Sequence, residues 1–237
     1  MDKRPSYHNS LSLTNTSGHP QTVAIFQKLA EGFNVEVKPD HTQYWRSMLT
    51  VARALDTLVD THTPASIQTE ARQLVQGVPI DGITKDEAQE FSQIFQVASP
   101  ERQAAIQQGL SINDYAIAMR KATTYSEFVD LRVEEAELFG HVMQLDNPNE
   151  HATINTFNTW LPSFARAGYL IDSFGDFSSD YKEGIIGLEP TVSRRIKLGK
   201  RALSETFNAG SQLPPRTIAF LAAASLSKMA RNGLRKK

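Results

Sequence analysis

Aspartate residues at four-residue spacing are the side chains of this sequence best suited to chemistry. Asp56 and Asp60 form one such pair, and Asp172, Asp176 and Asp180 repeat the spacing twice with no lysine or arginine between them. On a helix of about 3.6 residues per turn, each set forms a stripe along one face. Like charges so arranged repel each other, and a hard divalent cation with oxygen ligands would relieve the repulsion. The two stripes therefore predict a site for a hard divalent cation.

The alternative interpretation of the aspartates is two ordinary solvated helix faces. A single pair at four-residue spacing is common on such faces and would not by itself indicate a metal. The triple without intervening basic residues is rarer. Two stripes more than a hundred residues apart in the sequence are rarer still. Together they favour two metal-binding helices that face each other.

The elements expected to position these stripes are helices. Apolar residues recur at helical spacing through most of the chain, and strand-like alternation never persists. The first stripe falls in a helix predicted over 44–61, and the second in one over 152–181, which Pro162 kinks or splits in two. The other helices are predicted over 21–33, 64–76, 85–98, 100–108, 112–145, 191–207 and 214–232.

Length and composition limit the architecture. The chain has 237 residues, 40% of them hydrophobic and 22% charged, and it contains no cysteine. This length supports one full helical domain, or at most two small ones. The lack of cysteine excludes thiol nucleophiles, cysteine-ligated zinc and disulfides. We predict an all-α fold with a flexible N-terminal arm over 1–20, rich in polar and turn-forming residues, and a single helical domain over 21–237.

Charge and hydropathy bear on partners and location. The net charge of −1 argues against nucleic acid as a partner. The first ten residues lack the apolar stretch of a signal peptide, and the apolar run over 218–226 is too short to cross a bilayer. We expect a cytoplasmic protein, as a monomer or a homodimer. The basic tail over 228–237 has two interpretations: peripheral contact with an anionic membrane, or a solvated helix end, which is favoured.

The two aspartate stripes resemble the paired motifs of class I isoprenoid synthases. In the squalene and phytoene synthase branch, the first motif is DxxxD with a preceding basic residue, and residues 53–60 are similar to it. The second motif continues the four-residue spacing and ends in a charged stretch with a glycine, which 172–184 matches in spacing. Terpene cyclases also place metal ligands at i, i+4 and i+8. The resemblance covers roughly residues 44–190 and implies an isoprenoid-synthase-like helical bundle with a central active-site cavity.

The sequence also departs from the condensing-enzyme pattern. Asp172 stands where the second motif begins with asparagine, and Gly175 stands where an arginine usually precedes the central aspartate. Charged residues intrude in 132–140, where the family has a helix of small residues, and the chain is short after the second motif. These departures favour a terpene cyclase, which is a lyase, over a transferase that condenses two prenyl chains.

The resemblance implies a Mg²⁺-dependent terpene synthase that ionises a prenyl diphosphate. The implied catalytic and metal-binding residues are Asp56 and Asp60 on one wall and Asp172, Asp176 and Asp180 on the other. Basic residues should bind the remaining phosphate oxygens, and an apolar, aromatic-lined cavity should hold the cation. The candidates for contact with the substrate are Arg53, Arg132, Arg166, Lys182, Tyr125, Phe164 and Tyr169. For each basic residue, an ordinary surface charge or ion-pair partner is the competing interpretation.

Three other functions are alternatives to a terpene cyclase. Head-to-head condensation of two prenyl diphosphates, as in squalene and phytoene synthases, requires room for two chains. A non-catalytic helical interaction protein would retain the fold without Mg²⁺-dependent binding of diphosphate. A di-iron bundle requires Glu-x-x-His motifs, and Glu137 and His141 are four residues apart instead of three.

Overall fold

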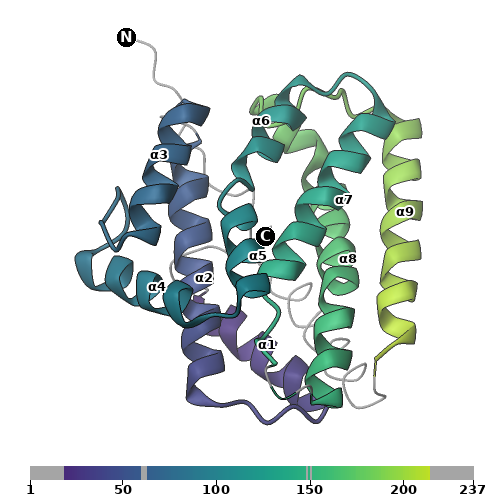
Figure 1. The fold of residues 1–237 in the computed structure, drawn as a ribbon. Helices are drawn as coiled ribbons and strands as arrows, with labels where there is room; N and C mark the ends of the chain where they lie inside the picture. The colour runs from purple at the N-terminus through teal and green to yellow at the C-terminus, as the bar shows by residue number, and fades with distance from the viewer. Residues whose placement is uncertain (1–18, 60–62, 148, 150, 214–237) are drawn as a thin grey trace, which may run out of the picture.

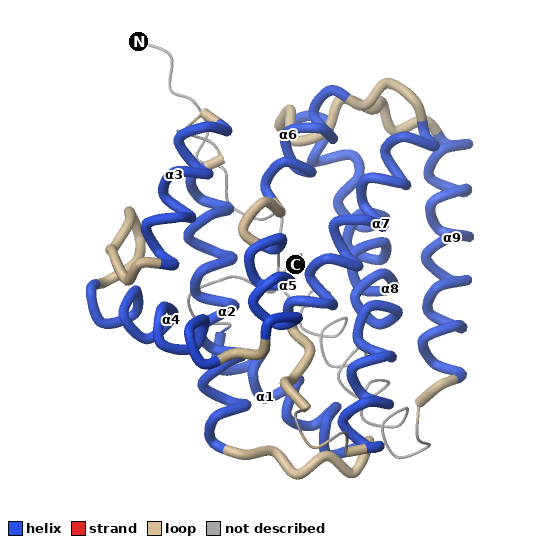
Figure 2. Tube along the Cα trace, viewed as in Figure 1, coloured by secondary structure: helices blue, strands red, loops and turns tan. Residues whose placement is uncertain are grey.

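The computed structural model describes residues 19–59, 63–147, 149 and 151–213. These residues form nine α-helices and no strand, which confirms the all-α prediction for this part of the chain (Figure 1, Figure 2). The helices are α1 (His19–Gly32), α2 (Pro39–Leu58), α3 (Pro64–Val75), α4 (Lys85–Val97), α5 (Pro100–Gly109), α6 (Asn113–Lys121), α7 (Tyr125–Val142), α8 (Ala152–Lys182) and α9 (Val192–Ser211).

The structure describes the two ends of the chain only in part. Helix α1 begins at His19, so the last two residues of the predicted arm over 1–20 are helical. Residues 1–18 and the helix predicted over 214–232 lie outside the described residues. The other predicted helices are present with small shifts at their ends, apart from the one predicted over 112–145.

The helix predicted over 112–145 is wrong as a single element. The structure has α6 and α7 instead, separated by residues 122–124. The Thr124 hydroxyl accepts a hydrogen bond from the Glu127 N–H at 3.2 Å, and the Glu127 carboxylate accepts one from the Thr123 N–H at 3.1 Å. Such side-chain contacts supply partners for backbone groups at a helix start. They begin a new helix although the apolar pattern continues across the break.

Pro162 does not split α8, which is one helix of 31 residues. A proline within a helix removes the N–H that would bond the carbonyl four residues earlier, here that of Asn158. The side chain of Gln144 donates to that carbonyl at 2.8 Å instead. Gly140 of α7 packs against the proline, and a Cβ atom there would lie 2.5 Å from Pro162 Cα. Gln144 and Gly140 thus contact α8 at the point where Pro162 interrupts its hydrogen-bond ladder.

Two apolar clusters meet along α8. The first joins α1–α5 to the N-terminal part of α8, where the Trp160 ring lies 5.0 Å from Phe33 and 6.3 Å from Phe157. The second joins α6, α7 and α9 to its C-terminal part, where Phe128 stacks on Phe177 at 5.4 Å. Helices α2 and α8 run in the same direction (Figure 1). The C-terminal halves of both helices, which carry the aspartates, therefore lie toward the same end of the molecule.

Candidate functional site

The second aspartate stripe follows one side of α8. Asp172 and Asp176 are half-buried, and Asp180 is 5% exposed. Burial raises the pKa of Asp180 to about 7; Arg132 opposes this rise, and the carboxylates of Asp176 and Asp172 add to it. The carboxylates of Asp172 and Asp176 therefore both act on the buried carboxyl of Asp180.

A buried ion pair on α7 faces this stripe. Arg132 Nη1 donates to Glu135 Oε2 at 2.7 Å, and both residues are 7% exposed. Burial raises the pKa of Glu135, and Arg132 counteracts that rise. Sequence reasoning predicted Arg132 but missed Glu135. In the sequence Glu135 is one of several charged residues over 132–137, and only the packing of α7 against α8 distinguishes it.

Tyr169 connects the two acidic motifs. Its phenol is buried, and its pKa is raised well above the ordinary value, first by burial and then by the charge of Glu135, while Arg132 opposes the rise. Asp56 of α2 and Asp172 of α8 each raise this pKa further. The carboxylates of both predicted motifs therefore act electrostatically on the same buried side chain. Asp60 lies outside the described residues.

Two arginines at this centre have donor atoms without hydrogen-bond partners among the described residues. They are Arg53 Nη1 on α2, three residues before Asp56, and Arg132 Nε on α7; the Nε atoms of Arg102, Arg120 and Arg166 likewise have no hydrogen-bond partner among the described residues. A buried donor left unpaired costs free energy, and most buried polar atoms in proteins are paired. Both arginines were predicted to bind phosphate oxygens.

Arg166, by contrast, is engaged in an ion-pair network among α7, α8 and α9. Its Nη1 lies 2.5 Å from Glu137 Oε1, and its Nε lies 3.3 Å from Glu205 Oε2. Arg201 reaches the other oxygen of Glu205 at 2.9 Å. Arg166 is therefore an ion-pair partner, which was one of the two interpretations of this residue from the sequence. Its ion pair with Glu205 joins α8 to α9.

The remaining predicted contact residues differ in their surroundings. Lys182 is exposed at the C-terminal end of α8. The ammonium of Lys197 lies 5.9 Å from the ring centroid of Tyr125. Phe164 stacks on Trp160 at 4.8 Å and packs against the first apolar cluster. Of the predicted aromatic side chains, Tyr169 is the one that the structure joins to both acidic motifs.

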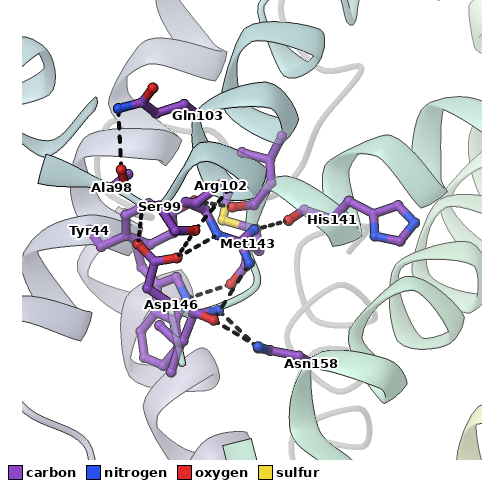
Figure 3. Close-up of polar contacts among 12 residues, drawn as sticks. Tyr44, Ala98, Ser99, Arg102, Gln103, His141, Met143, Asp146 and Asn158 are labelled. Atoms are coloured by element: carbon purple, nitrogen blue, oxygen red, sulfur yellow. Dashed lines mark hydrogen bonds and ion pairs between the residues drawn. The ribbon is translucent and has the colours of Figure 1, made fainter. Parts of the chain in front are cut away.

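A second polar cluster, which sequence reasoning missed, surrounds Arg102 of α5 (Figure 3). The last carbonyls of a helix have no partner within the helix. Four side chains donate to carbonyls at or just beyond the end of α7: Arg102 to His141 (2.6 Å), Tyr44 to Val142, Trp45 to Met143 (2.9 Å) and Asn158 to Leu145 (2.7 Å). Asp146 accepts bonds from Ser99 N–H and Oγ at 3.1 and 2.7 Å. This cluster joins α2, α5, α7 and α8, and its role is structural.

The described residues contain no group of three or more histidine or acidic side chains close enough to hold a metal ion by themselves. Mg²⁺ in phosphate-binding sites is typically held by one or two carboxylates together with waters and phosphate oxygens of the substrate. The half-buried aspartates and the two unpaired arginine nitrogens fit such a shared site. No helix within the described ranges is both long and apolar enough to cross a membrane.

Comparisons of the chain with protein-family models, with curated proteins and with solved structures found no match.

Proposed function

We propose that this protein is a Mg²⁺-dependent class I isoprenoid synthase that ionises a prenyl diphosphate bound between α2 and α8. The observation that supports the proposal is the placement of the two aspartate motifs: Asp56 lies in the C-terminal half of α2 and Asp172 in that of α8, and the two helices run in the same direction (Figure 1). The motifs, more than a hundred residues apart in the sequence, therefore lie toward the same end of the molecule. Asp56 and Asp172 also both contribute to the raised pKa of Tyr169, after burial and Glu135.

The carboxylates of this centre would hold the metal. Asp56 would bind Mg²⁺ from α2, with Asp60 beside it as the sequence predicts, and Asp172, Asp176 and Asp180 would do so from α8. Mg²⁺, when bound, supplies positive charge that stabilises the leaving diphosphate. A nearby cation favours the charged form of a carboxyl. Asp180, whose pKa is about 7 in the metal-free protein, would therefore lose its proton in the loaded site.

The two unpaired arginine nitrogens would bind the diphosphate. Glu135 occupies Nη1 of Arg132 at 2.7 Å, which fixes the guanidinium plane and leaves Nε as a donor. Arg53 Nη1 would approach from α2. Donors that are fixed in place before the substrate binds lose little free energy to reorganisation when charge develops.

Tyr169 would shield the prenyl cation. Its ring centroid lies 5.7 Å from that of Phe139, and the pair belongs to a buried cluster. The phenol is neutral near pH 7, as a tyrosine of ordinary pKa also is, so its ring adds no anion that a cation would alkylate. Aromatic faces attract cations, and exclusion of water prevents early quenching.

The direct experiment is incubation with Mg²⁺ and prenyl diphosphates of several chain lengths, scored by diphosphate release and by mass spectrometry of the hydrocarbon products. Asp56→Asn and Asp176→Asn should each lower release by about a hundredfold or more, as expected for loss of a charge-stabilising group. Asp130→Asn, an exposed residue of α7, is the matched control and should retain activity. Products containing two prenyl chains would favour condensation over cyclisation.

Binding of inorganic diphosphate tests the same site without choosing a chain length. Calorimetry should show binding that requires Mg²⁺ and is lost in the Asp56 and Asp176 variants. If the parent protein binds no diphosphate with Mg²⁺ and releases none from any substrate, the non-catalytic interpretation replaces the proposal. Unchanged release in both aspartate variants would also reject the proposed metal site.

A further inference from the structure

One side of α9 carries apolar side chains that the structure leaves exposed. Val192 and Phe207 are each 76% exposed, Leu203 is 61% exposed and Ile196 is 54% exposed. At about 100° per residue, these four positions fall within roughly 60° of the helix circumference. The side of α9 that packs against the rest of the protein is a different one, formed by Leu198, Ala202, Glu205 and Ala209. Helix α9 therefore has two apolar sides, and one of them is exposed in the part of the chain that the structure describes.

Helix α8 extends this exposed stripe. Phe174 is 41% exposed, and its ring lies 3.0 Å from the position that a Cβ atom would take at Gly199 of α9. Ile171, one turn earlier on α8, is 51% exposed. We call the six residues Ile171, Phe174, Val192, Ile196, Leu203 and Phe207 the α9 patch. Contiguous exposed apolar surface of this kind marks an interaction site more often than isolated exposed residues do.

The charges of α9 indicate what the patch contacts. The helix has five basic residues and one acidic residue. The acidic residue, Glu205, is buried and already paired with Arg166 and Arg201. By helical projection, Arg195 lies at one edge of the exposed stripe and Lys200 at the other, and both are exposed. The outer surface of α9 is thus an apolar stripe bordered by cations.

We propose that α9 binds the surface of an anionic lipid membrane, with the α9 patch inserted between headgroups and its basic residues on the lipid phosphates. Helices that lie in a membrane interface have this pattern of apolar residues flanked by lysine and arginine, and anionic leaflets attract such clusters. A second copy of the chain is a poor occupant, because a two-fold contact through α9 would bring like charges together. The proposal does not depend on the isoprenoid synthase activity.

A single fluorescent label tests the contact directly. The chain has no cysteine, so Leu203→Cys in the full chain accepts one environment-sensitive dye within the patch. Vesicles that contain phosphatidylglycerol should shift the emission to the blue, and vesicles of phosphatidylcholine alone should not. Added salt should weaken the effect because it screens the charges. Val97→Cys, at an 85% exposed position on α4, is the matched label and should not respond.

Paired substitutions then separate the apolar contribution from the charges. Leu203→Ser with Phe207→Ser should reduce partitioning onto anionic vesicles by about tenfold or more, since both side chains would insert in the interface. Arg195→Glu with Lys200→Glu should remove the preference for anionic lipid. The matched controls on α4, Val97→Ser and Lys85→Glu, should bind as the parent does. All six substitutions are at exposed positions, so circular dichroism should stay that of the parent.

Three results would overturn the proposal. The first is a lack of binding to anionic vesicles. The second is binding that neither pair of substitutions weakens. The third is a dye at position 203 that is already blue-shifted and protected from iodide before any vesicle is added, because the patch would then be covered by protein. Light scattering at several concentrations would tell whether the cover is a second copy or another segment of the same chain.

Discussion

Arg132 and Glu135 form an ion pair of 2.7 Å inside the protein, on the side of α7 that faces α8. Removing two charges from water costs several kcal/mol, which their attraction offsets only with good geometry. The pair uses one nitrogen of the guanidinium, and Nε has no hydrogen-bond partner among the described residues. Arg132 therefore balances the charge of Glu135, and under the proposed function its Nε would also donate to the diphosphate.

Arg132→Met should destabilise the protein by about 3–5 kcal/mol, because it leaves Glu135 buried without its partner. Adding Glu135→Leu to that variant should restore most of the loss, since it removes the orphaned charge. Urea unfolding followed by circular dichroism measures both effects. The double variant should still fail to bind diphosphate with Mg²⁺. Retained binding in that stable background would exclude Arg132 as a diphosphate ligand.

Asp180 should make the metal-free protein less stable as pH rises through the acidic range. Burial raises its folded pKa to about 7, whereas an unfolded aspartate titrates near 3.9. Between these values the folded state keeps a proton that the unfolded state has released, so stability falls with increasing pH and then levels off. The full loss is on the order of a few kcal/mol.

Asp180→Asn isolates that contribution, because the amide has no proton to release. The variant should be more stable than the parent at about pH 8, and its advantage should shrink toward pH 5. Urea midpoints for both proteins across this range provide the measurement, in buffer without divalent cations. A difference between the two proteins that is constant with pH would mean that Asp180 titrates normally in the fold.

The helices that carry the aspartates were predictable because their apolar and acidic residues keep one period over many turns. The pairing of the motifs predicted two stripes that face each other, but it indicated neither Tyr169 as the buried side chain near both nor Glu135 as the partner of Arg132. No feature of the neighbouring sequence distinguishes Glu135 from the other charged residues beside it. Glu135 is buried because α8 packs against α7. The central cavity implied by the family resemblance stays a prediction.

Other details were decided by contacts that a periodic pattern does not contain. The break between α6 and α7 depends on the cap formed by Thr124 and Glu127, within an unbroken apolar pattern. The continuity of α8 depends on Gln144, which lies outside that helix. The exposed side of α9 was hidden because a covered and an uncovered apolar side of one helix look alike in sequence.

Gly140→Ala should destabilise the contact between α7 and α8. The added Cβ would lie 2.5 Å from Pro162 Cα, which is backbone and cannot rotate away. Overpacking of this kind typically costs about 1–3 kcal/mol. Gly168→Ala on α8 is the control, because nothing lies within 4 Å of its Cβ position, and it should stabilise by up to about 1 kcal/mol through helix propensity. Equal urea midpoints for the two variants would contradict the close approach.

Gln144 should matter only while Pro162 is present. Gln144→Met removes the donor to the Asn158 carbonyl and should cost about 1–2 kcal/mol, because a partly buried acceptor loses its partner. Pro162→Ala supplies a backbone N–H that can bond the same carbonyl. In that background Gln144→Met should cost at least about 0.5 kcal/mol less, which is a coupling that a double-mutant cycle of urea unfolding resolves. An identical cost in both backgrounds would mean that the side chain of Gln144 does not replace the hydrogen bond that the proline removes.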